Sequence, residues 1–236
     1  MSIASEILRL QQAKNDLAVS IANKGVTVPA SATLDDYHTL VDNIQQGGGT
    51  LPYDAEIEYI ESTGTQYIDT GITFAYGTDV IELSLNIAIT SGTPRQLNGA
   101  NGFLFFGVNA SQKFEISGTA AGTYNSNFHN WYLHCMAGKR IIGTLDGTAY
   151  SGGTPAATNT NIYSIYLFAL GGTNSAAASF FIKEKLKEAI IKKNGKVVRY
   201  YNPVRKNGIG YLYDNISKSL FGNDGTDNFI LGNDIV

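Results

Sequence analysis

Three carboxylates lie close together in the short segment from Glu56 to Glu61. Side chains two residues apart on a β-strand share a face, so Glu56 and Glu58 have the arrangement of an acid and a nucleophile that flank one sugar bond. Glu61 points to the other face unless a bulge intervenes. An edge strand also uses such charges to block pairing with other chains. We expect this second role, and a glycoside hydrolase using Glu56 and Glu58 is the alternative.

The remaining candidates for chemistry are weaker. His129 and His134 are separated by an odd number of residues, which places them on opposite faces of a regular strand and argues against a zinc site. The segment 223–228 is rich in oxygen ligands, so calcium is conceivable there, but its Asp224-Gly225 pair also suits a plain turn. No nucleophile elbow and no phosphate-binding glycine loop is present. We therefore expect no enzyme, no metal and no cofactor, with calcium as the alternative.

Composition limits the partners. The chain has 236 residues, a net charge of -3 and a single cysteine, Cys135. This charge argues against nucleic acid, and no apolar run is long enough to insert into a membrane. Nine of the seventeen basic residues lie between Lys183 and Lys206. We expect solvated strands around the Asn194-Gly195 turn there, and a patch for an acidic glycan or an acidic subunit is the alternative.

The first part of the chain reads as helical. An apolar stripe recurs at intervals of three and four residues between residues 3 and 24, and Thr33 with Asp36 forms a capping signal for a second helix. The positions that we expect to serve attachment or oligomerisation are Ile3, Ile7, Leu10, Leu17, Ile21, Leu34, Tyr37, Val41 and Ile44. The stripe has the heptad spacing of a short coiled coil, with Lys14 at its middle. It also suits a hairpin in which the second helix covers the first.

From Leu51 onward the pattern changes to period two. Large aliphatic residues alternate with smaller or polar ones between Ile81 and Ile89, as in a strand with one buried face. Asn-Gly and Asp-Gly pairs recur at residues 98, 101, 146, 194, 207 and 224, several of them expected at hairpin tips. Many short strands with such turns indicate a two-sheet sandwich or jelly roll.

Residues 58–71, EYIESTGTQYIDTG, resemble the opening strand, turn and strand of laminin-G-like, concanavalin A-like jelly rolls found in proteins of bacteriophages and gut bacteria. Segments 131–134, 143–147, 196–205, 208–214 and 221–226 resemble later strands and hairpins of the same family, so the likeness covers nearly all of residues 51–236. The resemblance implies a fold that often binds glycans. It also implies that Glu58 and Glu61 belong to the framework.

Residues 22–29, Thr33 to Tyr37 and Ile44 resemble the helical segment that begins many phage tail, baseplate and head-fibre proteins. This resemblance implies an attachment or oligomerising element, commonly in trimeric appendages.

We therefore expect a mainly β chain: a helical attachment segment at 1–46, a glycine-rich linker at 47–50, and a laminin-G-like jelly roll at 51–236. The expected role is a non-catalytic structural protein of a phage virion, such as a fibre, baseplate or decoration subunit, assembled in the host cytoplasm. Its expected partners are other virion proteins, sister chains in a homotrimer, and a host-surface glycan.

Overall fold

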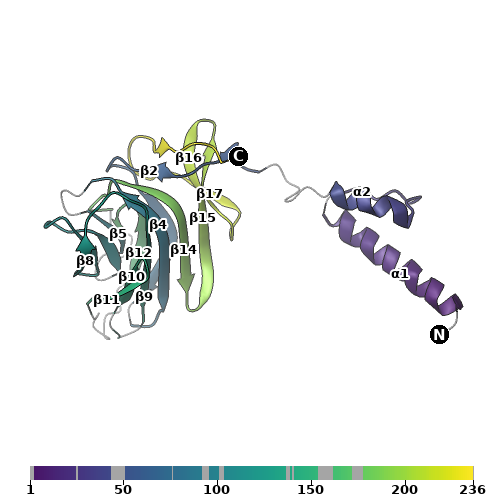
Figure 1. The fold of residues 1–236 in the computed structure, drawn as a ribbon, viewed down its shortest axis with the longest axis horizontal. Helices are drawn as coiled ribbons and strands as arrows, with labels where there is room; N and C mark the ends of the chain where they lie inside the picture. Colours follow the sequence, from purple (N-terminus) through teal and green to yellow (C-terminus); the bar gives the residue numbers. More distant parts are fainter. Residues whose placement is uncertain are drawn as a thin grey trace. The chain divides into compact units, whose positions relative to one another are not determined.

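The structure of this chain is a computed structural model (Figure 1). It describes residues 3–24, 26–43, 51–75, 77–91, 96–100, 104–136, 139, 141–153, 162–171 and 178–235. The chain divides into two compact units, Met1–Leu51 and Pro52–Val236, which we call the foot and the head. Ile44 and the expected linker at 47–50 lie outside the described residues.

The foot consists of helix α1 (Ile3–Ala22), the 3-10 turn η1 (Leu34–Asp36) and helix α2 (Tyr37–Asp42). Its small core contains Ile21, Ala32 and Tyr37, and the Tyr37 hydroxyl donates to the backbone oxygen of Lys14 at 3.3 Å. The Asp36 carboxylate accepts hydrogen bonds from the backbone nitrogen of Thr33 at 2.7 Å and from its hydroxyl at 2.8 Å. These contacts fix the start of the second helical segment where the capping signal predicts it.

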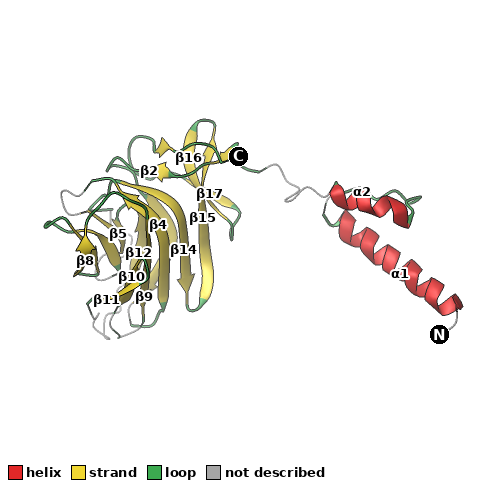
Figure 2. Ribbon diagram, in the orientation of Figure 1, coloured by secondary structure: helices red, strands yellow, loops and turns green. Residues whose placement is uncertain are grey.

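The head holds the described strands, which form a large and a small sheet (Figure 2). The large sheet has the order β11-β10-β9-β4-β14-β15-β16-β17, with β1, β2 and β18 attached. Its strands are β1 (Ala55–Glu56), β2 (Ile60–Glu61), β4 (Ile81–Ile89), β9 (His129–Cys135), β10 (Ile142–Leu145), β11 (Thr148–Ser151), β14 (Glu184–Lys193), β15 (Lys196–Lys206), β16 (Ile209–Asp214), β17 (Ser219–Phe221) and β18 (Ile230–Leu231).

The small sheet has the order β3-β12-β5-β6-β7-β8, and β13 pairs in parallel with β5. Its strands are β3 (Ile68–Ala75), β5 (Gln96–Ala100), β6 (Phe105–Val108), β7 (Lys113–Ile116), β8 (Thr119–Thr123), β12 (Ile162–Leu167) and β13 (Leu170–Gly171). One apolar core draws residues from both sheets. The predicted fold class is therefore confirmed: the chain is mainly β, a two-sheet jelly-roll sandwich preceded by a small helical segment.

The core of the head follows from period-two patterning. The alternating aliphatic residues of β4 are all buried, and their polar neighbours lie on the outer face of the large sheet. Trp131 on β9 lies at the centre, with ring centroids 4.9 Å from Phe106 and 5.2 Å from Phe114 of the small sheet. These aromatic contacts join the two layers.

Three of the predicted turn dipeptides form hairpin tips. Asp146-Gly147, Asn194-Gly195 and Asn207-Gly208 connect successive antiparallel strands, and both residues of each pair have positive φ. This is the geometry of a two-residue hairpin turn whose twist matches the strands. Asn98-Gly99 is different, because it lies within β5, and Asn101-Gly102 falls outside the described residues.

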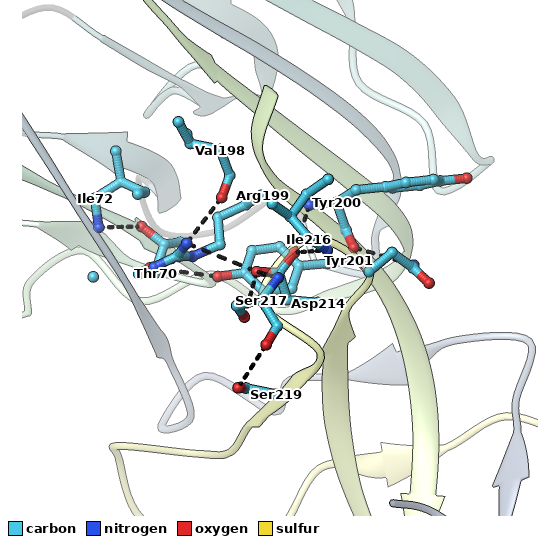
Figure 3. A network of polar contacts seen from close by, with 12 residues as sticks. Thr70, Ile72, Val198, Arg199, Tyr200, Tyr201, Asp214, Ile216, Ser217 and Ser219 are labelled. Carbon is cyan, nitrogen blue, oxygen red and sulfur yellow. Dashed lines mark hydrogen bonds and ion pairs between the residues drawn. The ribbon is translucent and has the colours of Figure 1, made fainter. Parts of the chain in front are cut away.

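A polar network fixes β15 against β3 of the small sheet (Figure 3). The Arg199 side chain donates to the backbone oxygen of Thr70 at 2.9 Å, and its guanidinium lies 3.7 Å from the buried carboxylate of Asp214. Asp214 also accepts from the Tyr200 backbone nitrogen at 2.8 Å and from the Ser217 hydroxyl at 2.7 Å. Burial alone would raise the pKa of Asp214, but these hydrogen bonds hold it below its usual value. The network thus links β15 to β3 and to the turn that follows β16.

A second polar link crosses the core. Glu184 on β14 is 0% exposed, and its Oε1 accepts a hydrogen bond from the Asn98 side-chain amide of β5 at 2.5 Å. Its Oε2 has no hydrogen-bond partner in the described part of the chain. Burial raises the pKa of Glu184 to about 8, and the bond from Asn98 offsets only part of that effect. The carboxyl group is therefore mostly protonated at neutral pH.

Candidate functional site

The outer face of the large sheet carries rows of polar and aromatic side chains. In one row the strand register places Asn130, Asn86 and Glu188 beside one another. The next row runs Thr144, Tyr132, Ser84, Ile190 and Tyr200 across β10, β9, β4, β14 and β15. At about 4.8 Å between neighbouring strands, five strands span roughly 19 Å. The outer face therefore offers a continuous surface of amides, hydroxyls and rings.

Two hollows lie on this face and meet at Glu188. The larger, of about 430 Å³, is lined by Glu56, Ile57, Glu58, Lys187, Glu188, Tyr200, Asn202, Pro203 and Ile235. The smaller, of about 180 Å³, is lined by Ser84, Leu85, Asn86, Asn130, Trp131, Tyr132, Thr144, Gly147 and Glu188. A register shift between Leu186 and Glu188 brings the Glu188 position opposite Asn86, which places its side chain on the outer face.

Each carboxylate of the larger hollow is bound by a neighbouring donor. The Tyr200 hydroxyl donates to Glu188 at 3.1 Å, the Tyr53 hydroxyl to Glu56 at 3.0 Å, and the Asn233 amide to Glu58 at 3.1 Å. The charge of Glu188, its hydrogen bond and burial together raise the pKa of Tyr200. Each bond uses one carboxylate oxygen, which leaves the other oxygen able to accept from a ligand.

The two residues of the hydrolase alternative line the same hollow. Glu56 belongs to the two-residue strand β1, which pairs with the outer end of β15, and Glu58 follows the isolated bridge between Ile57 and Asp234. Both side chains are exposed to solvent. Glu61 is not part of this hollow and lies 3.8 Å from the ammonium group of Lys185. The expected opening strand is thus broken into two short pieces at the margin of the large sheet.

Several polar groups on the outer face have unused hydrogen-bonding capacity. Among the described residues, the side chains of Ser84, Thr144 and Asn202 have no hydrogen-bond partner, and Asn86 Oδ1 is a buried atom without a donor. Asn86 uses its amide nitrogen to donate to Asn130 at 2.8 Å. This oxygen is buried within the sheet surface, so the groups that a ligand could reach are those of Ser84, Thr144 and Asn202.

Five of the nine basic residues in the segment 183–206 form ion pairs with acidic side chains from other described elements. The ion pairs are Lys185 with Glu61 at 3.8 Å, Lys192 with Glu82 at 3.4 Å, Lys193 with Asp79 at 3.2 Å, Arg199 with Asp214 at 3.7 Å and Arg205 with Asp234 at 2.8 Å. Lys187 lies 4.2 Å from the centre of the Phe128 ring. These pairings agree with the predicted solvated strands around the Asn194-Gly195 turn.

The histidines and the oxygen-rich loop have structural partners. His129 lies on the core side of β9 and contacts Asp146 at 2.5 Å, whereas His134 lies on the outer side. Asn223 accepts from the backbone nitrogen of Tyr67 at 3.1 Å, and Asp224 accepts from that of Asp69 at 2.8 Å. The loop thereby ties β3 to the C-terminal strands. Within the described residues, no group of three His, Cys, Asp or Glu side chains is arranged to hold a metal ion.

The foot presents an apolar stripe to solvent. Ile3 and Ile7 are 83% and 51% exposed, and Leu10, Leu17, Leu34 and Val41 are also exposed. Ile21 and Tyr37 are buried in the core of the foot itself. Helix α2 covers only the C-terminal end of the stripe, so the hairpin interpretation accounts for part of the pattern and leaves the first three turns of α1 uncovered.

Glu56 and Glu58 could be identified as candidates from the sequence, whereas the rest of the outer face could not. Asn86, Asn130, Ser84 and Tyr132 occupy the polar positions of two strands whose apolar positions are easy to recognise. Their alternation was the available signal. What it could not show is that β9, β4 and β14 are neighbours, because these strands are far apart in the chain.

A comparison with known protein families finds no family model that matches this chain, and a comparison with curated proteins finds no relative. Among the described residues, no helix is both long enough and apolar enough to cross a membrane.

Proposed function

We propose that this chain is a non-catalytic structural protein of a phage virion, serving as a fibre, baseplate or decoration subunit. The foot attaches the protein to the particle and to sister chains, with a homotrimer as the expected form. The head is presented for contact with a host-surface glycan or another virion subunit. Two resemblances support this assignment: that of residues 22–29, 33–37 and 44 to the helical segment of phage tail, baseplate and head-fibre proteins, and that of residues 58–71 to jelly rolls of bacteriophages and gut bacteria.

One observation carries the proposal: the exposed stripe on α1. A soluble monomer seldom leaves several large aliphatic side chains in a row in water, and such a row marks an interaction surface. Its heptad spacing suits packing against parallel copies of the same helix. A few short helices bury little alone, so packing against other chains also supplies stability that the foot lacks.

Comparing the full chain with a chain that begins at Pro52 tests this proposal. Light scattering is expected to give three associated chains for the full protein and one for the head alone. A full-length protein that remains monomeric at tens of micromolar would reject self-association through the foot.

A second candidate function is glycoside hydrolysis, because Glu56 and Glu58 line one hollow. Hydrolysis needs one carboxyl group to be protonated, which burial usually achieves. Both groups are exposed, and this is why we favour the non-catalytic function. The hydrolase would be supported if the full chain depolymerised a polysaccharide and Glu58→Gln abolished that activity. The non-catalytic proposal expects no depolymerisation by either protein.

A further inference from the structure

We propose that the two joined hollows on the outer face of the large sheet bind an uncharged glycan chain that runs across the strands from β10 to β15. This inference rests on the proposed function, because it names the class of glycan that the head binds and the face of the head that binds it. It concerns the face described above, and not the loops at the ends of the sandwich.

The position of the site follows from the strand register. Thr144, Ser84 and Tyr200 belong to one row that crosses five strands, and Glu188 joins the two hollows in the adjacent row. The hollows are open to solvent and the larger one is mainly polar, which suits a ligand with many hydroxyl groups that retains part of its hydration. A span of roughly 19 Å is long enough for a short oligosaccharide.

Hydrogen-bonding capacity identifies the ligand chemistry. Sugar hydroxyls donate and accept hydrogen bonds. The unused groups here include the second oxygen of Glu188, which accepts, and the side-chain amide of Asn202, which both donates and accepts. Hydrogen bonds from a neutral hydroxyl to a carboxylate are stronger than those between neutral groups. Tyr132 and Tyr200 add ring surface beside these groups.

Charge sets the class of glycan. The larger hollow is lined by Glu56, Glu58 and Glu188 but by a single cation, Lys187, whose ammonium group lies over the Phe128 ring. A uronic acid, sialic acid or phosphate group would meet three carboxylates at short range and be repelled. Lys185, Lys192 and Lys193 each form an ion pair with an acidic residue outside the larger hollow. An uncharged chain avoids this penalty.

The test uses the full-length protein and a glycan array that carries uncharged hexose and N-acetylhexosamine oligosaccharides together with uronate, sialylated and phosphorylated ones. Binding is expected on uncharged glycans and absent on the anionic ones. Equal or stronger binding to anionic glycans would overturn the inference.

The best uncharged oligosaccharide is then titrated against variants. Glu188→Gln retains an acceptor for the Tyr200 hydroxyl and is expected to weaken binding about tenfold, because a charge-assisted bond becomes neutral. Asn202→Ala removes an amide with no internal partner and is expected to weaken binding several-fold. The control is Glu6→Gln, which makes the same chemical change at a position in the foot. It is expected to leave the affinity for the oligosaccharide unchanged. Unchanged affinity in both outer-face variants, with the fluorescence of Trp131 intact, would overturn the site.

Light scattering on the same samples separates this inference from the proposed function. An oligomer that binds none of the glycans would overturn the inference and leave foot-driven association standing. A monomer that binds uncharged glycans through Glu188 and Asn202 would support the inference and reject self-association.

Discussion

Helix α1 and strand β4 each carry a regular line of five large aliphatic side chains, yet the two lines differ in what covers them. The line on α1 is Ile3, Ile7, Leu10, Leu17 and Ile21, and the line on β4 is Ile81, Leu83, Leu85, Ile87 and Ile89. All five positions of β4 are buried, whereas only Ile21 is buried on α1. Periodicity thus identifies the apolar face of an element, and the partner that covers this face decides its role.

The head is a closed core and the foot is an incomplete one. The core of the head closes because a second sheet covers the inner face of the large sheet. On α1 only the C-terminal end is covered, where Ile21 packs with Ala32 and Tyr37. Changes in the head should therefore alter its stability, and changes along the exposed part of α1 should alter association.

The largest effect is expected from the pH dependence of the head. Because the pKa of Glu184 is raised to about 8 from an ordinary value of 4.5, the unfolded chain releases this proton first as pH rises. The contribution of Glu184 to the free energy of unfolding should be complete below about pH 4.5 and should be lost progressively up to about pH 8. The total loss should be at most about 5 kcal/mol. Urea unfolding at pH 5 and pH 8, followed through Trp131, measures this loss.

Glu184→Gln provides the control for that experiment, because a glutamine keeps an acceptor for Asn98 and does not ionise. The pH-dependent loss should be much smaller in this variant. The lowered pKa values of Asp79, Asp146 and Asp214 act in the opposite direction and only below about pH 4, so they do not mask it. An equal loss of stability in both proteins would show that Glu184 is not responsible.

Truncation of the central aromatic cluster is the next largest effect. Phe106→Ala leaves a cavity beside Trp131 and should lower the free energy of unfolding of the head by about 3–5 kcal/mol. Leu10→Ala in the foot removes an exposed side chain and should change head stability by less than about 0.5 kcal/mol. Denaturant titrations of both variants with Trp131 as the probe test this contrast. Similar losses would contradict the division between closed and incomplete cores.

A glycine in the C-terminal loop gives a smaller effect. A Cβ atom at Gly225 would lie 2.1 Å from the backbone oxygen of Thr65, so Gly225→Ala should destabilise the head by about 2 kcal/mol. At Gly195 the space is open but φ is +78°, and Gly195→Ala should cost about 1 kcal/mol. Thermal unfolding ranks the two variants. The reverse order would mean that the 223–228 loop does not tie β3 to the C-terminal strands.

The smallest effect concerns the start of the second helical segment. Asp36→Ala removes the acceptor of both Thr33 hydrogen bonds and should weaken the local structure by about 1 kcal/mol. Asp35→Ala is a matched control, since the Asp35 side chain makes no hydrogen bond among the described residues. Amide exchange of α2 should become several-fold faster in Asp36→Ala alone. Equal acceleration in both variants would assign the effect to charge.

Much of the fold could be predicted from the sequence because it depends on local signals. The alternation of β4, the spacing of α1 and turns such as Asn194-Gly195 are each set by residues within a few positions of one another. The outer face could not be predicted in the same way. It brings Asn86, Asn130 and Glu188 together from three strands, and that assembly depends on long-range pairing and on a bulge.

We expect the uncovered stripe of α1 to associate with sister chains, while the head folds on its own. Sedimentation equilibrium of the full chain and of the Ile7→Lys/Leu10→Lys double variant tests this association, with Gln12→Lys, which lies off the stripe beside Asp16, as the control. We expect three associated chains for the wild type and the control, and a single folded chain for the double variant. A wild type that stays monomeric, or a double variant that associates as the wild type does, would contradict the claim.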